Sequence, residues 1–206
     1  MGALTEFYAN NPNDPPDFLV GEKVNLGGNG PIRNMANPQA LGDPNCYSAQ
    51  IPNTEVHAAA GPQNHWFYLL SQGSVGSPTC NGSTLAGIGI QKAGQVFYQG
   101  LLRKTSAWTH FAARRATLAG TLTLFPGSCT EFNAVRAAWS AISVPAQAGE
   151  PTCNSQPGND FSISVNPNAV SVQPGQSATV TVDTQVTGGS AQTVNLSAAF
   201  RSESVV

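Results

Sequence analysis

The stretch EVHAAAGPQNHWFYLL, residues 55–70, decides the fold because it places a segment of small residues directly before a solid apolar run. Helical periodicity over residues 64–72 predicts a helix, and Gly73 follows at a position where helices commonly end. His65 falls in the first turn of that helix, so we expect it to pack or to hydrogen-bond to the backbone. His57 lies among small residues, which leaves two interpretations: a capping residue in a loop, or a catalytic group.

Helical periodicity continues in three further segments, residues 91–104, 106–125 and 130–142. Thr130 is placed to cap the last of them, because a threonine hydroxyl can accept a bond from an unpaired backbone N–H. Four side chains of that helix share one face and are predicted to be buried: Phe132, Val135, Trp139 and Ile142. These patterns predict a mainly α fold built as a helical bundle.

Long loops come before this bundle. Residues 1–9 predict the end of a helix, because the prolines and asparagines of the following NNPNDPPD cannot continue one. Turn-forming residues are frequent in residues 17–53, where we expect loops and at most a short helix over residues 38–41. Loops of this length often carry function.

The composition changes after Val144. Residues 146–158 are rich in proline and small polar residues and predict a linker. Four later segments alternate apolar and polar side chains and predict strands: residues 161–165, 169–173, 177–186 and 193–200. A tail of about 48 residues is too short for a seven-strand sandwich of roughly 100, so we expect a partial antiparallel β module. The predicted organisation is a helical domain at 1–145, a linker at 146–158 and a β segment at 159–206.

The charge content excludes several classes of partner. Charged residues make up 10% of the chain, compared with roughly 25% in ordinary soluble domains. The net charge is −2 and the sequence has no run of Lys or Arg, so it lacks the positive surface that nucleic acid or an anionic membrane requires. It also has no apolar stretch of about 18 residues that could span a bilayer. We expect a secreted protein with no nucleic-acid partner and no membrane partner.

The chain has four cysteines, which show no C-x-x-C spacing and stand near no histidine cluster. This pattern favours disulfides over a metal site or a redox pair. Three connectivities are possible, and the pairing of neighbours, Cys46 with Cys80 and Cys129 with Cys153, is the simplest. Each such link would contribute roughly 3 to 4 kcal/mol through loop entropy. Disulfides indicate export, although the N-terminus shows no signal-peptide pattern.

The familiar catalytic motifs are missing from the sequence. It contains no H-E-x-x-H zinc helix, no G-x-S-x-G turn, no P-loop and no dinucleotide-binding glycine motif. The three histidines, His57, His65 and His110, do not have the spacing of a zinc site. The residues alone therefore predict no zinc ligands in this chain and no self-sufficient active site.

Two smaller features have both a functional and an ordinary interpretation. Arg33, in GPIRNMANP, could orient a carbonyl or a carboxylate, although most isolated arginines are simply surface residues. Glu6, Asp17 and Glu22 are separated by loop carbonyls, and such oxygen groups suit a hard cation such as calcium. The alternative for these three carboxylates is a solvated acidic edge.

Five stretches, read together, resemble the C-terminal helical lobe of the thermolysin-like zinc metallopeptidases, of the secreted actinobacterial kind. They are ALTEFYANNPNDPPDFLVGEKV, PIRNMANPQALGDPNCYS, EVHAAAGPQNHWFYLLSQGS, GIGIQKAGQVFYQGLL and FNAVRAAWSAISV. They occur in the order of the family over residues 2–144, and the resemblance implies an orthogonal helical bundle. Residues 159–200 resemble the immunoglobulin-like or pre-peptidase modules of exported hydrolases, a pattern that the final RSESVV abandons.

The resemblance implies a division of the active site between two lobes. In the family, the H-E-x-x-H helix with its glutamate base and a further zinc-binding glutamate precede the point where this chain begins. The zinc ligands would therefore lie on a missing N-terminal lobe. His57 matches the family histidine that hydrogen-bonds the oxyanion, and Arg33 matches the arginine that holds a substrate carbonyl just past the scissile bond.

The family's calcium-binding segment is matched by three carboxylates and one backbone carbonyl: Glu6, Asp17, Glu22 and Leu19. The remaining aspartate of that calcium site would lie upstream. Leu19 replaces a carboxylate found in members with two adjacent calcium ions, so at most one ion is implied. The family aspartate that orients the histidine falls at Pro52, and Glu55 is a candidate to substitute for it.

From this resemblance we expect the C-terminal part of an extracellular zinc metalloendopeptidase, with calcium as a second cofactor. Its substrates would be peptides or proteins cleaved before bulky apolar residues, and this chain would be inactive alone. Two alternatives remain: a non-catalytic secreted protein that binds peptides or polysaccharides, and a truncated gene product without selected function.

Overall fold

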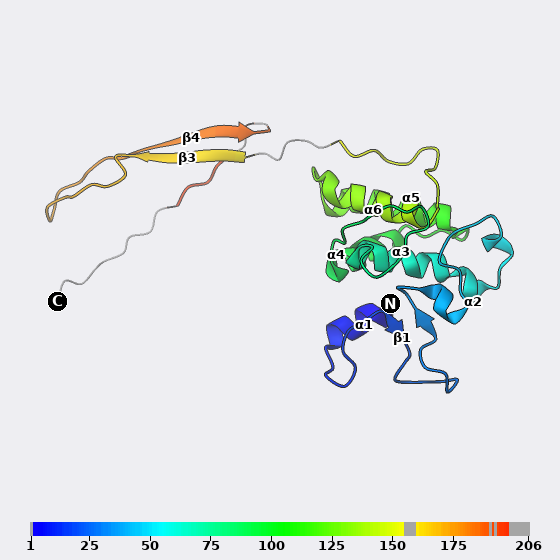
Figure 1. The fold of residues 1–206 in the computed structure, drawn as a ribbon. Coiled ribbons are helices and arrows are strands. Elements are labelled where there is room, and N and C mark those ends of the chain that lie inside the picture. The colour runs from blue at the N-terminus through cyan, green and yellow to red at the C-terminus, as the bar shows by residue number, and fades with distance from the viewer. Residues whose placement is uncertain (1, 155–159, 190, 192, 198–206) are drawn as a thin grey trace. The chain divides into compact units, whose positions relative to one another are not determined.

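The computed structural model describes residues 2–154, 160–189, 191 and 193–197 (Figure 1). The chain divides into two compact units, residues 1–155 and 156–206. The described part of the first unit is mainly helical, and that of the second contains an antiparallel strand pair. The prediction of a mainly α fold with a partial antiparallel β tail is confirmed.

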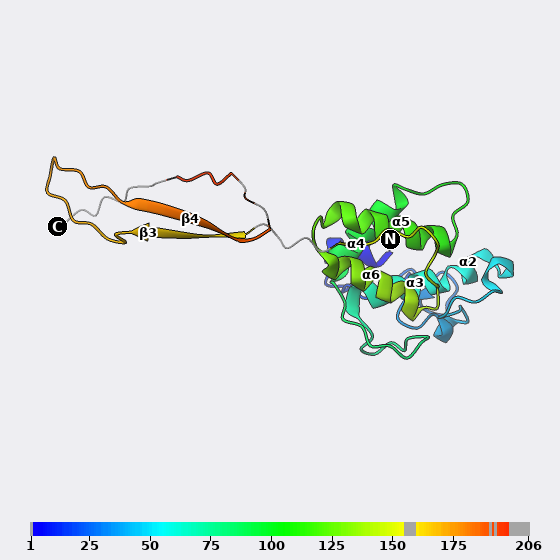
Figure 2. The same ribbon diagram turned by 90° about the horizontal axis from the view of Figure 1, so that it is seen from above.

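The helical unit is organised around four long helices: α3 (Gly61–Gln72), α4 (Ile90–Leu101), α5 (His110–Leu124) and α6 (Cys129–Ala141). They pack in a closed cycle, since α3 contacts α4, α4 contacts α5, α5 contacts α6, and α6 returns to α3 (Figure 2). The N-terminal helix α1 (Gly2–Ala9) packs against α4 from outside this cycle.

Two helix starts differ from the sequence-based expectation. Helix α3 begins at Gly61, three residues earlier than expected, because Pro62 fits a first helical turn, where a missing N–H costs no internal bond. Helix α5 begins at His110, four residues later than expected. Thr109 caps it, and its side-chain oxygen accepts a hydrogen bond from the N–H of Ala112 at 3.2 Å.

The start of α6 corrects another expectation. Thr130 is not the cap of this helix, because Ser128 occupies the N-cap position and Cys129 is already helical. At the end of α3 the expectation is confirmed. Gly73 has a φ of 84°, and its N–H bonds to the carbonyl of Leu69, so the glycine ends the helix in a conformation that other residues rarely adopt.

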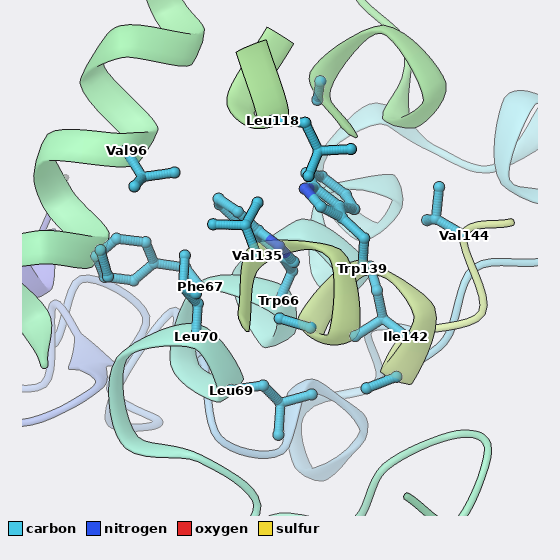
Figure 3. Packing of buried hydrophobic residues seen from close by; sticks show 14 of the residues in the cluster. Trp66, Phe67, Leu69, Leu70, Val96, Leu118, Val135, Trp139, Ile142 and Val144 are labelled. Carbon is cyan, nitrogen blue, oxygen red and sulfur yellow. The ribbon is translucent and has the colours of Figure 1, made fainter. Parts of the chain in front are cut away.

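The core of the bundle is built around two stacked indole rings. Trp66 of α3 lies against Trp139 of α6, with ring centroids 4.5 Å apart and planes inclined by 22° (Figure 3). The indole N–H of Trp139 donates to the hydroxyl of Thr117 on α5 at 2.9 Å, which ties a third helix to the pair. The four side chains predicted to be buried on α6 are in this core: Phe132, Val135, Trp139 and Ile142.

Helices α4 and α5 approach closely because each offers a glycine at the contact. A Cβ added at Gly100 would lie 2.7 Å from the Cγ2 of Thr117, and one added at Gly120 would lie 2.8 Å from the Cβ of Gln99. The missing side chains therefore set the distance between the two helices.

A segment beyond α6 remains tied to the bundle. Arg114 is only 1% exposed, and its guanidinium makes an ion pair with the Glu150 carboxylate and donates to the Val144 carbonyl at 3.0 Å. The Cys129–Cys153 disulfide holds the same segment to the start of α6. Part of the stretch expected as a linker, residues 146–158, thus packs on the helical unit, and residues 155–159 lie outside the described part.

The second disulfide joins Cys46 to Cys80, so the predicted pairing of neighbours is confirmed for both bridges.

The segment before α3 contains short elements: β1 (Leu19–Val20), β2 (Arg33–Asn34), η1 (Pro38–Leu41), η2 (Ile51–Asn53) and α2 (Val56–Ala59). Strands β1 and β2 pair antiparallel. The short helix expected at residues 38–41 is η1.

The described part of the second unit contains one antiparallel pair, β3 (Asp160–Asn166) and β4 (Thr181–Gly188). Phe161, Ile163 and Val165 alternate along β3, as the period-two pattern predicts, and all three are exposed. The segments 169–173 and 193–197 were expected to be strands, but neither is one, and residues 198–200 lie outside the described part. No helix of the described chain has the length and hydropathy needed to cross a bilayer.

Candidate functional site

His57 is the second residue of the four-residue helix α2 and lies two residues after Glu55, which caps this helix. The carboxylate of the capping residue, Glu55, accepts hydrogen bonds from the backbone N–H of His57 at 2.9 Å and of Ala58 at 3.1 Å. Its second oxygen lies 2.6 Å from Nδ1 of the His57 ring. A single carboxylate therefore starts the helix and also fixes the orientation of the imidazole.

The electrostatics of this pair determine which ring nitrogen carries a proton. The hydrogen bond to His57 is the largest cause that lowers the pKa of Glu55 below its usual value, so Glu55 is an ionised acceptor at neutral pH. Nδ1 of His57 must then be the donor, which leaves Nε2 for another partner. The His57 side chain is 75% exposed, so its ring is accessible.

Arg33 lies in β2, at the edge of the same unit. Its Nη1 donates to the carbonyl of Ile32 at 2.6 Å and stands 3.8 Å from a carboxylate oxygen of Asp43. The arginine side chain is 25% exposed. No hydrogen bond or ion pair joins Arg33 to His57 within the described ranges, so the structure does not connect the two predicted catalytic residues directly.

The three carboxylates predicted to hold calcium do come together. Ligand oxygens of Glu6 on α1 and of Asp17 and Glu22 around β1 lie within 4.8 Å of one another. Helix α1 packs against β1, which brings residues far apart in the sequence to one place. Asp17 also accepts the backbone N–H of Leu19 at 2.7 Å, which shapes the turn between them.

The backbone of β1 indicates where the carbonyl of Leu19 points. The carbonyls of its neighbours Phe18 and Val20 accept hydrogen bonds from Met35 and Ile32, at the side of strand β2. Because carbonyls alternate in direction along an extended strand, that of Leu19 points away from β2 and is not used by the strand pair. It is therefore available to a ligand.

Asp14 is a fourth carboxylate at this site that the sequence did not single out. One buried oxygen each of Glu6, Asp14 and Glu22 has no hydrogen-bond partner among the described residues. Burial is the largest cause that raises the pKa of both Glu6 and Glu22, and the neighbouring carboxylates raise it further. The sequence signal for Asp14 was the first aspartate of NNPNDPPD, which the surrounding prolines made look like part of a turn only.

The other two histidines have structural surroundings. His65 is fully buried, with Nδ1 2.9 Å from the carbonyl of Asn45 and Nε2 2.8 Å from the hydroxyl of Ser77. The burial and the bond to the Asn45 carbonyl agree with the expectation that His65 packs or hydrogen-bonds to the backbone. Burial lowers the pKa of both His65 and His110.

Within the described residues, only Glu6, Asp17 and Glu22 form a group suited to a metal ion, and three carboxylates do not match a zinc site built from His or Cys.

The geometry agrees with one known family. The family model for the thermolysin metallopeptidase alpha-helical domain matches residues 1–144. The chain belongs to the thermolysin metallopeptidase family. Among its thermolysin-family relatives is the transglutaminase-activating metalloprotease of Streptomyces mobaraensis, which is 38% identical over 185 residues, or 84% of this chain and 24% of the relative.

Other thermolysin-family relatives are more distant. The bacillolysin of Bacillus caldolyticus is 34% identical over 151 residues, which cover 70% of this chain and 26% of the relative. The thermolysin of Alicyclobacillus acidocaldarius gives the same identity and coverage. The chain thus spans about a quarter of the length of these metallopeptidases. It represents their C-terminal helical domain, as the resemblance in the sequence implied.

Proposed function

We propose that this chain forms one wall of the active-site cleft of a secreted zinc metalloendopeptidase. The zinc ligands and the glutamate base would lie on an N-terminal lobe of the complete protein. The observation that carries the proposal is the Glu55–His57 pair, which holds an exposed imidazole by Nδ1 and leaves Nε2 accessible. Secretion is supported by the two disulfides and by the low charge content.

His57 would stabilise negative charge on the carbonyl oxygen of the scissile peptide bond. Because Glu55 accepts the proton on Nδ1, Nε2 can donate a hydrogen bond only when the ring carries both protons. A donor fixed in this way before the reaction can be worth roughly 3 to 4 kcal/mol of transition-state stabilisation. Zinc on the other lobe would supply the activated water.

Arg33 would position the substrate. Its ion pair with Asp43 is long, at 3.8 Å, so the guanidinium keeps N–H groups that a substrate carbonyl can use. A cavity of about 200 Å³ lined by Met35, Ala60 and Phe67, among others, lies close to the end of α2. Four of its six lining residues, these three and Phe97, are apolar, and they support a preference for an apolar residue after the scissile bond.

We assign calcium to the acidic cluster, with Glu6, Asp17, Glu22 and the carbonyl of Leu19 as ligands. The buried carboxylate oxygens of Glu6 and Glu22 that have no partner support this assignment, because a bound cation would satisfy them, and a third such oxygen belongs to the neighbouring Asp14. Calcium would hold α1 against β1. It would also restrict the motion of Arg33, because Arg33 lies in β2 and pairs with Val20 of β1.

Reconstituted hydrolysis tests the function. The chain should not hydrolyse an internally quenched apolar peptide with zinc and calcium present, whereas adding a lobe that carries H-E-x-x-H should restore turnover. His57→Ala should then lower turnover by roughly two orders of magnitude. Chelator-sensitive hydrolysis by this chain alone, or unchanged turnover in His57→Ala, would refute the proposal. Metal-independent, saturable peptide binding without restored turnover would favour a non-catalytic binding protein.

Calcium binding has a test of its own. Calcium should raise the thermal midpoint of the chain, and terbium should give sensitised luminescence that calcium displaces. Glu22→Gln should weaken both effects, while Glu55→Gln, a carboxylate outside the cluster, should not. A thermal midpoint that does not respond to calcium in the wild-type chain would remove the assignment.

A further inference from the structure

Trp108, in the loop before α5, lines two cavities that the proposed catalytic site does not use. The first, the apolar cavity, has a volume of about 440 Å³, and its lining includes Tyr47, Ile51 and Phe111. The rings of Tyr47 and Phe111 lie with centroids 5.1 Å apart, so they form a fixed aromatic surface. A volume of this size with mainly apolar walls is typical of ligand pockets.

The second, the basic cavity, has a volume of about 260 Å³ and is lined by Arg103, Arg115 and Trp108, among others. The guanidinium of Arg103 is held in place by hydrogen bonds to Gln99 and Thr123. Arg115 is exposed and has no hydrogen bond or ion pair with any residue in the described part of the chain. No Asp or Glu lines either cavity, so the positive charge is not neutralised locally.

The two cavities share Trp108 in their linings. In an extended peptide, side chains two residues apart lie on the same face, about 6.6 to 6.8 Å from each other. One such side chain can therefore pack on each side of a single aromatic ring. The apolar cavity suits a large apolar side chain, and the basic cavity suits a carboxylate, because arginine pairs with carboxylates through two parallel hydrogen bonds.

We propose that the two cavities form a groove that binds an extended peptide segment with a large apolar side chain and a carboxylate two residues away. The apolar side chain enters the apolar cavity and the carboxylate pairs with Arg115. Residues of α2 also line the apolar cavity, so the bound segment would contact the helix that carries His57. The proposal does not depend on peptidase activity, because the groove is complete within this chain.

Titration of the chain with a short peptide tests the proposal. The probe is acetyl-Glu-Ala-Phe-Ala-Glu-amide, which offers a carboxylate two residues from the aromatic ring in either direction. Trp108 is the only partly exposed tryptophan, since Trp66 and Trp139 are fully buried, so its indole should report binding in fluorescence and NMR. We expect saturation with a dissociation constant below about 1 mM, a modest affinity for a short flexible ligand.

Matched peptides and variants decide the outcome. Replacing both acidic residues of the probe by lysine, or its phenylalanine by alanine, should weaken binding at least about tenfold. Arg115→Glu should do the same, whereas Arg136→Glu on α6, also an exposed arginine, should leave binding unchanged. Equal binding of the lysine peptide, no effect of Arg115→Glu, or no saturation at several millimolar probe would overturn the proposal. Equally tight binding of 3-phenylpropionate would assign the groove to small aromatic acids instead.

Discussion

Glu55 contacts two backbone N–H groups and one imidazole, so the start of α2 and the orientation of His57 depend on the same side chain. The sequence indicated Glu55 only as a substitute for an aspartate missing at Pro52. A carboxylate two residues before the histidine reaches the ring only because α2 begins between them. No propensity scale would predict that local turn.

Glu55→Ala should release the His57 ring and uncap α2. We expect the ring to lose its preference for a proton on Nδ1 and to shift toward the tautomer protonated on Nε2, because the acceptor that fixed Nδ1–H is gone. The ¹⁵N chemical shifts of the ring report the tautomer directly. Glu55→Asp, which keeps a carboxylate at the cap, is the control, and unchanged shifts in Glu55→Ala would show that the contact does not form in solution.

His65 should make the stability of the chain depend on pH. Burial lowers its pKa below the ordinary value of 6.5, so around that value the unfolded chain binds the proton more readily than the folded chain. Stability is therefore full above pH 6.5 and is lost as the pH falls toward the folded pKa.

Urea unfolding at pH 7.5, 6.0 and 5.0 measures this loss. His65→Gln should be less stable at neutral pH, because it disturbs the bonds to Asn45 and Ser77, but its stability should fall less steeply with acidification. His110→Gln serves as a comparison, since burial lowers the pKa of that histidine as well. Equal slopes in wild type and His65→Gln would contradict the prediction.

At the scale of elements, periodicity located the helices but not their ends. The four buried positions on α6 follow from spacing alone, because a helix has one face toward the core. The start of α5 at His110 depends on whether Thr109 or an earlier residue caps the helix, which the packing of the preceding loop decides. In the β tail, periodicity predicted strands that do not form. Alternation predicted strands at 169–173 and 193–200, but neither 169–173 nor the described residues 193–197 form one, because alternation alone does not supply a pairing partner.

Gly100→Ala should destabilise the bundle by about 1 to 3 kcal/mol, because the new methyl group would meet Thr117 at 2.7 Å and push α4 from α5. Thr117 also accepts the bond from Trp139, so the shift should reach the core. Chemical unfolding followed by tryptophan fluorescence measures the change. Gln95→Ala, at an exposed position of the same helix, should have little effect, and equal stability of both variants would show that the helices separate easily.

At the scale of the molecule, the sequence predicted the acidic cluster better than the other surfaces. Glu6, Asp17 and Glu22 lie together as expected. That expectation came from the family resemblance, which supplied a pattern that composition could not. Asp14 was not expected, although it lies three residues before Asp17, because the prolines around it indicated only a turn. The groove at Trp108 was not foreseen either, because its walls come from three separate segments.

Glu150→Ala should destabilise the helical unit by about 3 to 5 kcal/mol, because it leaves the guanidinium of Arg114 buried without its partner. Thermal and urea unfolding measure the loss. Arg136→Ala, which removes an exposed arginine of α6, should change stability by less than about 0.5 kcal/mol. A small effect of Glu150→Ala would mean that Val144 and Ser140 alone suffice to hold Arg114.

The anchoring of Glu150 and Cys153 bears on where this domain can be cut. The family match stops at residue 144. A polypeptide that ended there would lack Glu150 and Cys153, so Cys129 would become a free thiol and the buried guanidinium of Arg114 would have no carboxylate partner. A separately produced helical unit should therefore end no earlier than residue 154.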